Sequence, residues 1–516
     1  MAENGFWAYA QAEPTKLALV EPEGREWSRG ELAAASNRAV HGLRALGLAR
    51  GDAVAVAMPN CGEFVALHLA CAQAGFYLTP INWHLASPEI AYILRDSEAK
   101  AFVSHERIAE LATAAADQVG FPPDRRFAVG SIPGFRPFGE LLAGQPDSPP
   151  SDRTAGAVMN YTSGTTGHPK GVKRPLPPID PDTAGSLFAM FLALFGIQPE
   201  DGNVHLVGSP LYHTAVLVFA SSSLHYGHPI VLMDKWTPEG CLAAIDSYRV
   251  STSHMVPTQF HRMLGLPDEI RSRYDVSSTR TMVHAAAPCP PEIKRRMIDW
   301  WGDSIFEYYA ATEGGGTLVT PTEWKRFPGT VGKAWPGAEV RIYDDAGNLL
   351  APGQTGTVYM KLGQADFEYK GDREKTRKNR IGEFFTVGDV GHLNDEGFLF
   401  LSDRKIDMII AGGVNIYPAE IENVLLTHPK VGDVAVFGVP DPDWGEAIKA
   451  VVEPADGVSA GPALADELIE FCRANLAKYK WPRSVDFLAE LPRDPNGKLY
   501  KRKLRDPYWE GRERSI

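Results

Sequence analysis

The stretch from Tyr161 to Val172, YTSGTTGHPKGV, combines glycines and small hydroxylated residues with a proline, a lysine and a last glycine. Glycine allows positive φ and a close approach of the backbone to an anion, while N–H and hydroxyl groups donate hydrogen bonds. Lysine adds a positive charge. The pattern predicts a loop that holds a phosphate chain, although a flexible turn has a similar composition. The candidate ligands are Thr162, Ser163, Gly164, Thr165, Thr166, Gly167 and Lys170.

This loop differs from the P-loop of nucleoside triphosphatases. In the P-loop pattern, GxxxxGK[ST], a hydroxyl residue follows the lysine and binds magnesium. Here Lys170 follows Pro169 and precedes Gly171, so that hydroxyl is missing. The stretch instead resembles the signature loop of the AMP-forming adenylate-forming enzymes, which include acyl-CoA synthetases, nonribosomal-peptide adenylation domains and beetle luciferases. The resemblance implies that companion motifs follow in a set order.

Length and charge limit the classes of protein that fit. The chain has 516 residues, of which 44% are hydrophobic, so two or more domains with their own cores are expected. The net charge of −12 argues against a general affinity for nucleic acid or anionic membranes. The first residues lack a basic region followed by an apolar one, and no apolar run approaches about 18 residues. We therefore expect a cytoplasmic protein without membrane insertion.

Helical and extended patterns alternate from Trp27 onward, which predicts a mostly parallel sheet with crossover helices. Prolines and glycines accumulate between residues 121 and 156, so we expect a long surface connection there. The apolar segment 184–195 predicts a buried helix too short to span a membrane. The predicted elements before the glycine-rich loop include helices at 32–46 and 63–75 and strands at 53–58, 77–81, 99–103 and 157–161.

Two matches to the family lie in the middle of the chain. In PLYHT, residues 210–214, His213 occupies the place where the family has an aromatic residue or a histidine that gates the acyl pocket. The stretch AAAP, residues 285–288, is similar to the small-residue segment that packs against adenine, which implies nucleotide contacts from Ala286 and Ala287. The same comparison assigns further acyl-pocket positions to Val218, His284 and Ala285.

A third match is SIFEYYAATEGGG, residues 304–316, where the family pattern is Tyr-Gly-x-Thr-Glu. Thr312 is expected to bond a phosphate oxygen, and Glu313 to bind the magnesium ion that neutralises pyrophosphate. Tyr308 or Tyr309 is expected to stack on adenine. Ala310 replaces the usual glycine and would narrow the acyl pocket, so it bears on substrate shape.

The next matches concern the ribose and the domain junction. The resemblance implies that Asp389, in GDV, accepts hydrogen bonds from both ribose hydroxyls, and that Arg404 also contacts the ribose. The stretch SDRKIDMIIAGGVNIYPAEIE, residues 402–422, carries the family's hinge and a glycine loop for the thioester step, here Gly412 and Gly413. The hinge positions are Asp403 and Ile406; the family usually places Asp or Lys where Ile406 stands.

The resemblance extends to the end of the chain, where LPRDPNGKLYKRKLR contains the PxxxxGK pattern and assigns its lysine to Lys498. The implied fold is α/β: a large N-terminal domain of mixed, mostly parallel sheets with flanking helices and a small β-rich subdomain, followed by a small mobile α/β lid. We expect the large domain at 1–402, the hinge at 403–407 and the lid at 408–516.

These motifs together imply that a carboxylic acid reacts with ATP and Mg²⁺ to give an acyl-adenylate, whose acyl group then passes to coenzyme A. A carboxylate is a poor electrophile, and the mixed anhydride with AMP removes its charge and supplies a leaving group. Positioning and charge stabilisation are what such a step needs. The residues assigned to catalysis are Lys498, Thr312, Glu313 and His213.

The acceptor and the acid are less defined by the sequence. No carrier domain or serine carrier motif follows the predicted lid, which favours coenzyme A. Residues 215–220, AVLVFA, are apolar and favour a fatty, aromatic or bulky polycyclic acid. Three alternatives stay open: an adenylating enzyme with another acceptor (a carrier protein or a second ligase), a luciferase-like oxygenase, and a non-catalytic nucleotide-binding homologue. A homodimer is also open.

Overall fold

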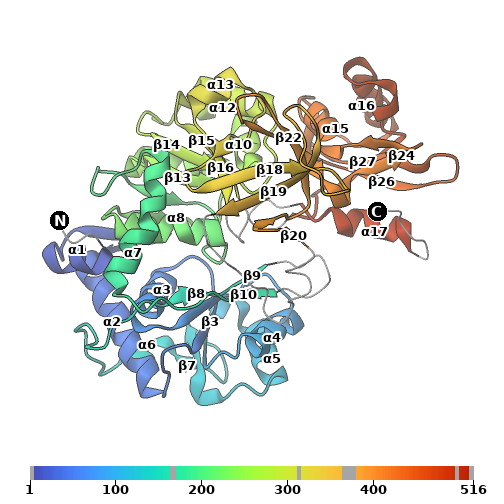
Figure 1. The fold of residues 1–516 in the computed structure, drawn as a ribbon. Coiled ribbons are helices and arrows are strands. Elements are labelled where there is room, and N and C mark those ends of the chain that lie inside the picture. The colour runs from blue at the N-terminus through green and yellow to red at the C-terminus, as the bar shows by residue number, and fades with distance from the viewer. Residues whose placement is uncertain (1–4, 163–169, 311–314, 363–378, 494–498, 511–516) are drawn as a thin grey trace. The chain divides into compact units, whose positions relative to one another are not determined.

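The computed structural model describes residues 5–162, 170–310, 315–362, 379–493 and 499–510. The described residues form two compact units, one from 5–254 and 272–282 and the other from 255–271, 283–362 and 379–510. Helices and sheets are mixed in both units, which confirms the α/β class (Figure 1). Within these described ranges, no helix is both long and apolar enough to cross a membrane.

The first unit contains a fully parallel sheet of six strands in the order β7-β6-β5-β3-β4-β8. Helices follow most of its strands, as the alternating pattern predicts (Figure 1). The strands are β3 (Ala53–Ala57), β4 (Tyr77–Pro80), β5 (Ala101–His105), β6 (Arg126–Val129), β7 (Arg136–Pro137) and β8 (Ala157–Val158). The helices are α2 (Arg29–Ala45), α3 (Gly62–Ala74), α4 (Ser87–Asp96), α5 (Ala109–Gln118) and α6 (Phe138–Leu142).

Strand β3 explains how this sheet is held between two layers of helices. Val54 and Val56 belong to the core that contains residues of α2 and α3, whereas Ala55 and Ala57 belong to the core that contains residues of α4 and α5. Successive side chains of a strand point to opposite faces, so both faces of β3 are buried. The uninterrupted apolar sequence AVAVA is the consequence of this double burial.

A second sheet of the first unit includes the strand order β13-β11-β12-β1-β2. Its pairs are parallel except for β1 with β2. The strands are β1 (Leu17–Val20), β2 (Glu26–Ser28), β11 (His205–Val207), β12 (Ile230–Leu232) and β13 (Thr252–Met255). The helices of this part are α1 (Phe6–Ala12), α7 (Pro181–Ala189), the 3₁₀ helix η3 (Met190–Phe195), α8 (Thr214–His225) and α9 (Pro238–Tyr248).

Three local predictions need correction. Residues 121–156 contain β6, β7 and α6, with Phe127, Phe138 and Leu141 buried, so the expected surface connection is wrong. The prolines and glycines there separate short elements instead of marking one loop. The predicted strand 157–161 is divided into β8 and β9 (Asn160–Thr162).

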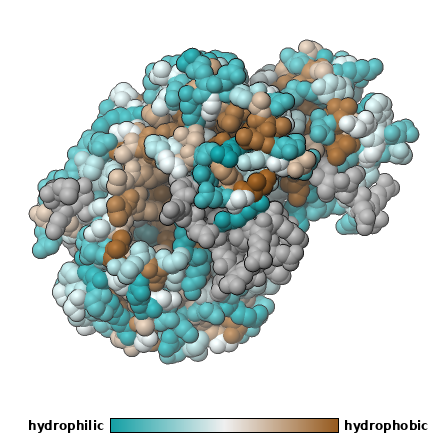
Figure 2. Space-filling view, viewed as in Figure 1, coloured by the Kyte–Doolittle hydropathy of each residue, from teal (hydrophilic) through white to brown (hydrophobic). Residues whose placement is uncertain are grey.

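The apolar segment 184–195 is the third correction. Helix α7 ends at Ala189 and continues as η3, and Leu187, Phe188 and Met190 are exposed by 57%, 49% and 60%. The prediction of a buried helix is therefore wrong. Figure 2 shows apolar surface gathered where Figure 1 places α7 and α8. The physical reason is that buried residues are mostly apolar, whereas apolar residues are often exposed, so an apolar sequence does not by itself predict burial.

His225 at the end of α8 is buried against α7 and α1. A Cβ added to Gly185 would lie 2.2 Å from the His225 ring, so only glycine allows α7 to approach this closely. The backbone N–H of Phe6 donates to Nδ1 of His225 at 3.2 Å, which requires that nitrogen to be unprotonated. Burial lowers the pKa of His225 to about 3. The native state therefore holds this ring neutral.

We expect His225 to contribute to acid lability. Below its unfolded pKa of about 6.5, the unfolded chain binds a proton that the native ring does not, so stability is lost as pH falls toward the folded-state pKa. His225→Asn keeps an acceptor near the Nδ1 position and should reduce the loss of unfolding free energy between pH 7 and 5 by about 1–2 kcal/mol. Denaturant titrations at both pH values measure this; an unchanged loss would contradict it.

The second unit contains an antiparallel strand series and a β-rich part. In the antiparallel series, β15 (Ile305–Ala310) pairs with β16 (Gly316–Val319), and β16 pairs with β17 (Lys333–Ala334). The helices of this region are α10 (Pro257–Leu264), α11 (Asp268–Arg271), α12 (Pro291–Trp301) and α13 (Pro321–Arg326). The β-rich part is antiparallel and consists of β18 (Ala338–Tyr343), β19 (Gly356–Leu362), β20 (Arg380–Ile381), β21 (Phe384–Phe385), β22 (Asp389–Leu393) and β23 (Leu399–Arg404).

The C-terminal part of this unit has its own sheet and core, as expected for a small α/β domain. A 3₁₀ turn, η4 (Lys405–Asp407), connects β23 to this part. The strands are β24 (Ile409–Ala411), β25 (Val414–Ile416), β26 (Val431–Asp441), β27 (Gly445–Pro454) and β28 (Ser484–Phe487). The helices are α15 (Pro418–Leu425), α16 (Pro462–Asn475), the 3₁₀ helix η5 (Lys478–Lys480) and α17 (Lys501–Trp509).

Candidate functional site

Asp389 and Arg404 face each other across two neighbouring strands. Asp389 begins β22, Arg404 ends β23, and the two are direct partners in this antiparallel pair. Direct cross-strand partners lie close enough for their side chains to interact. The Nε of Arg404 is 3.4 Å from Oδ1 of Asp389, and the Asp389 residue is 8% exposed. The register of β22 and β23 therefore places two predicted ribose ligands together.

Tyr309 joins this pair from β15. Its hydroxyl donates a hydrogen bond to Oδ2 of Asp389 at 2.5 Å. Its neighbour Tyr308 is half-buried, and successive residues of a strand point to opposite faces. Three residues predicted to contact the nucleotide, Tyr309, Asp389 and Arg404, thus converge from three strands. Their arrangement leaves a carboxylate with hydrogen-bond donors on two sides.

The predicted adenine segment follows β14 (Thr281–His284). Ala285 is buried, Ala286 is exposed and Ala287 is half-buried. Ala286 has φ of 71°, in the left-handed region that residues with a Cβ adopt rarely. Such strain costs on the order of 1 kcal/mol and gathers at binding sites. The sequence does not predict a positive φ here, because that conformation is usually inferred from a glycine and residue 286 is an alanine.

His284, predicted to line the acyl pocket, is fully buried in a polar cluster that the sequence analysis missed. Its Nε2 is 3.5 Å from Oε2 of Glu307, and its ring packs edge-on against Phe260. The Nζ of Lys294, on α12, is 2.6 Å from the same Glu307 oxygen. Glu307 shares one face of β15 with Ile305 and Tyr309, because alternate residues of a strand point the same way. This glutamate between two largely apolar side chains was the sequence signal that could have indicated the cluster.

His213 and Val218 lie in the first unit. His213 immediately precedes α8 and is half-buried, with its ring 4.4 Å from that of Tyr212. Val218 is half-buried on α8, as are Thr214 and Ala215. These spacings of three and four residues place the less buried side chains on one face of the helix. The predicted acyl-pocket residues of this unit therefore share the beginning of α8.

The glycine-rich loop connects β9 to β10 (Lys170–Val172). The two strands pair antiparallel, with Thr162 opposite Lys170 and Tyr161 opposite Gly171. Tyr161 donates a hydrogen bond from its hydroxyl to Asp96 at 2.6 Å, which anchors the beginning of the loop. The predicted ligands Ser163, Gly164, Thr165, Thr166 and Gly167 lie outside the described residues, as do Thr312, Glu313 and Lys498.

Gly412 and Gly413, predicted for the thioester step, form the two-residue turn between β24 and β25. Their φ values are 59° and 79°, and such hairpin turns require positive φ at both positions. The N–H of Gly412 donates to the carbonyl of Trp444 at 2.7 Å, and a Cβ on Gly412 would lie 2.5 Å from the Trp444 ring. The turn therefore requires glycine for conformation and for space.

The remaining predicted positions lie at the ends of strands. Asp403, in β23, is half-buried and accepts hydrogen bonds from the backbone N–H groups of Arg404 and Ala419. Ile406 lies in η4 and is 42% exposed. Ala310 ends β15, where it pairs with Gly316 and is exposed.

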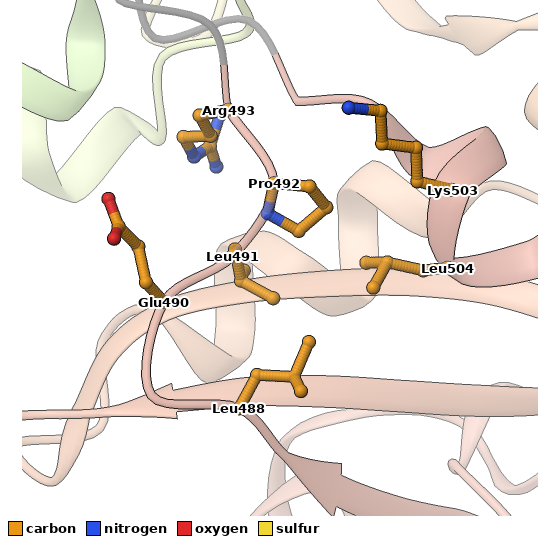
Figure 3. A pocket seen from close by; sticks show the side chains of 7 residues that line it. All are labelled: Leu488, Glu490, Leu491, Pro492, Arg493, Lys503 and Leu504. Carbon is orange, nitrogen blue, oxygen red and sulfur yellow. The ribbon is translucent and has the colours of Figure 1, made fainter.

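A cavity of about 490 Å³ lies in the C-terminal part of the second unit (Figure 3). Leu488, Leu491 and Leu504 form its apolar lining, and the charged residues among its neighbours are Glu490, Arg493 and Lys503. Arg493 is also bound to Asp433 through an ion pair. Among the residues that the structure describes, none of those predicted to bind nucleotide or acid lines this cavity.

Comparison with known families gives two matches that together span most of the chain. Residues 6–365 match the model described as AMP-binding enzyme, and residues 420–498 match the model described as AMP-binding enzyme C-terminal domain.

Individual relatives match over nearly their full length. A fatty acid–[acyl-carrier-protein] ligase of Streptomyces coeruleorubidus is 31% identical, with 98% of this chain and 96% of the relative covered. A feruloyl-CoA synthase of an Amycolatopsis species is 34% identical, with 97% and 98% covered. The crystal structure of ATP-bound MatB from Rhodopseudomonas palustris has a TM-score of 0.80 and 29% identity, with 98% and 99% covered.

Proposed function

Because the chain belongs to the AMP-binding enzymes and is an adenylating acyl ligase, we propose that it is an AMP-forming acyl-CoA synthetase for a hydrophobic carboxylic acid. In this reaction ATP and the acid give an acyl-adenylate and pyrophosphate. Coenzyme A then takes the acyl group as a thioester and releases AMP.

The observation that carries the proposal is the convergence of Tyr309, Asp389 and Arg404. Asp389 is nearly buried, receives the Tyr309 hydroxyl and lies beside the Arg404 guanidinium. A carboxylate accepts hydrogen bonds with both oxygens, so it is suited to two adjacent ribose hydroxyls. The strained backbone at Ala286 supports a role for the neighbouring segment in contacting the base.

The first step needs the carboxylate and the α-phosphate to be held together while negative charge builds on phosphate oxygens. We assign charge stabilisation to Lys498 and phosphate binding to Thr312 and the glycine-rich loop between β9 and β10. Glu313 would hold a magnesium ion, which supplies positive charge to the departing pyrophosphate. These assignments rest on sequence motifs.

The second step needs a thiol to reach the acyl-adenylate. We assign Gly412 and Gly413 to this step, since their turn presents backbone without side chains at the surface of the C-terminal part. The segment 403–407 would be the pivot for a movement of residues 408–516 between the two steps.

The apolar character of the beginning of α8 supports a hydrophobic acid. His213 and the half-buried face formed by Thr214, Ala215 and Val218 carry no acidic group that would bind the amino group of an amino acid. A carrier protein is the second candidate acceptor, because one of the relatives is a fatty acid–[acyl-carrier-protein] ligase.

A mass-spectrometric assay tests the proposed function. The enzyme is incubated with ATP, Mg²⁺ and a pool of linear, aromatic and polycyclic acids, with coenzyme A present or absent, and acyl-adenylate and acyl-CoA are scored separately. Acyl-CoA from one class of acid is the expected result. Adenylate that accumulates despite coenzyme A would favour another acceptor. Neither product from any acid would contradict the proposal and favour a non-catalytic nucleotide-binding protein.

Replacement of Asp389 tests the nucleotide site. Asp389→Ala removes an acceptor for charged hydrogen bonds, so we expect the KM for ATP to rise about 10- to 100-fold. Asp389→Asn keeps one acceptor and should have a smaller effect. Asp395→Asn is the matched control, because Asp395 lies in an exposed turn two residues after β22 ends. An unchanged KM in a folded Asp389→Ala variant would remove Asp389 from the site.

A further inference from the structure

The segment that joins the β-rich part to the C-terminal sheet is bound to the last helix by charged groups. Strand β23 and strand β24 belong to different sheets, and η4 connects them. On α17, the guanidinium of Arg505 lies 3.6 Å from Asp407 and donates to the backbone carbonyl of Ile406 at 3.3 Å. The Arg505 side chain is 9% exposed, so this contact is largely shielded from water.

Lys501, one turn earlier on α17, lies in the same cluster. Its Nζ is 2.7 Å from Oε1 of Glu422 on α15, and both side chains are at most 15% exposed. Burial by itself would lower the pKa of Lys501, but Glu422 and Asp403 outweigh it and raise that pKa. Glu422 also accepts a hydrogen bond from the backbone N–H of Val436. Lys501 therefore holds a charge among carboxylates from β23 and α15.

The hinge position 406 gains a physical interpretation from these contacts. The side chain of Ile406 is 42% exposed, and the contact made with α17 uses its backbone carbonyl. The charged group that binds α17 is the next residue, Asp407. An apolar residue at 406 is compatible with this arrangement because the side chain takes no part in the contact with Arg505.

We propose that Lys501 and Arg505 are positioning residues that hold the conformation of the 403–407 segment, and through it the position of the C-terminal domain during the reaction. Arg505 holds the segment through Asp407 and the Ile406 carbonyl. Lys501 holds α17 in place through its ion pair with Glu422 on α15. The effect on the reaction rests on the proposed function, whereas the effect on the segment does not.

Limited trypsin digestion of the full chain tests the segment directly, because Arg404 and Lys405 lie within it and are exposed. We expect Arg505→Met to be cut there about fivefold faster or more than the parent. Arg505→Lys, which keeps a charge, should restore most of the protection. Arg502→Met is the matched control, since Arg502 lies on the same helix, is 54% exposed and contacts Asp506. Lys501→Met should behave like Arg505→Met, and Lys501→Arg like Arg505→Lys.

The two half-reactions provide the second readout. Adenylation is followed by release of pyrophosphate, and acyl transfer is followed with preformed acyl-adenylate and coenzyme A. Arg505→Met is expected to change the ratio of the two rates about fivefold or more, with the Arg502→Met ratio unchanged. Cleavage and rate ratio both equal to those of the parent would overturn the proposal, and so would a lowered melting temperature without faster cleavage. Faster cleavage in a protein without either activity would contradict the proposed function but support the role of the cluster.

Discussion

Replacing Lys498 with alanine is expected to lower the rate of acyl-adenylate formation by about 100- to 1,000-fold, the effect typical of removing one group that stabilises transition-state charge. The PxxxxGK pattern assigns this lysine to the adenylation step. Negative charge on the phosphate oxygens increases as the acid attacks, so the loss should appear in the maximal rate more than in the KM for ATP. Release of pyrophosphate under saturating ATP and acid measures it.

The control and the second half-reaction make the Lys498 experiment specific. Lys503→Ala removes an exposed lysine on α17 and should leave adenylation within about twofold of the parent. If acyl transfer to coenzyme A is slowed as strongly as adenylation when preformed acyl-adenylate is supplied, the assignment of Lys498 to the first step is wrong. An unchanged adenylation rate would also contradict it.

Replacing Lys294 with methionine is expected to lower the free energy of unfolding by about 3–5 kcal/mol near pH 8, because it leaves the Glu307 carboxylate buried without its charged partner. Lys294 is fully buried, its Nζ is 2.6 Å from Glu307, and it also lies over the Trp324 ring. Denaturant unfolding measures the loss. The double variant Lys294→Met/Glu307→Gln removes both charges and should recover a large part of it.

The loss caused by Lys294→Met should depend on pH in a defined direction. Burial raises the pKa of Glu307, and Lys294 partly offsets that rise. Without the lysine the folded-state pKa rises further above its unfolded value. The neutral carboxyl is then favoured in the folded state, so the deficit relative to the parent is small at low pH and grows as pH rises through the folded-state pKa. We expect a smaller deficit at pH 5 than at pH 8; an equal deficit would show that lost packing, not charge, dominates.

The Lys294 cluster also connects stability to the nucleotide site. Glu307 precedes the two tyrosines of β15, and His284 precedes the Ala285–Ala287 segment. A variant that folds but holds these strands less firmly should therefore also have a higher KM for ATP. Comparing the single with the double variant separates the loss of charge from the loss of side-chain packing.

Local patterns predicted much of the fold. The helix expected at 32–46 is observed as Arg29–Ala45, and the strand expected at 53–58 as Ala53–Ala57. The helix follows from an apolar periodicity of 3.6 residues, and the strand from a short apolar run that ends before Pro59.

The errors arose where distant contacts decide the structure. Strand β6 was missed because its stability comes from pairing with β5 and from burial of Phe127, which the many prolines and glycines nearby concealed. The segment 184–195 was assigned to the core because it is apolar, although Leu187, Phe188 and Met190 are exposed. Composition by itself does not reveal which face of a segment another element covers.

The sequence by itself determined the family, the α/β class and the identity of the candidate ligands, because those depend on residue types at short spacings along the chain. Only the tertiary structure decided that Asp389 receives Tyr309 and Arg404, that Ala286 adopts a left-handed conformation, and that Lys294 and Arg505 are held in enclosed ion pairs. The reason is that pairing register and burial arise between residues far apart in sequence, where no local pattern records which groups meet.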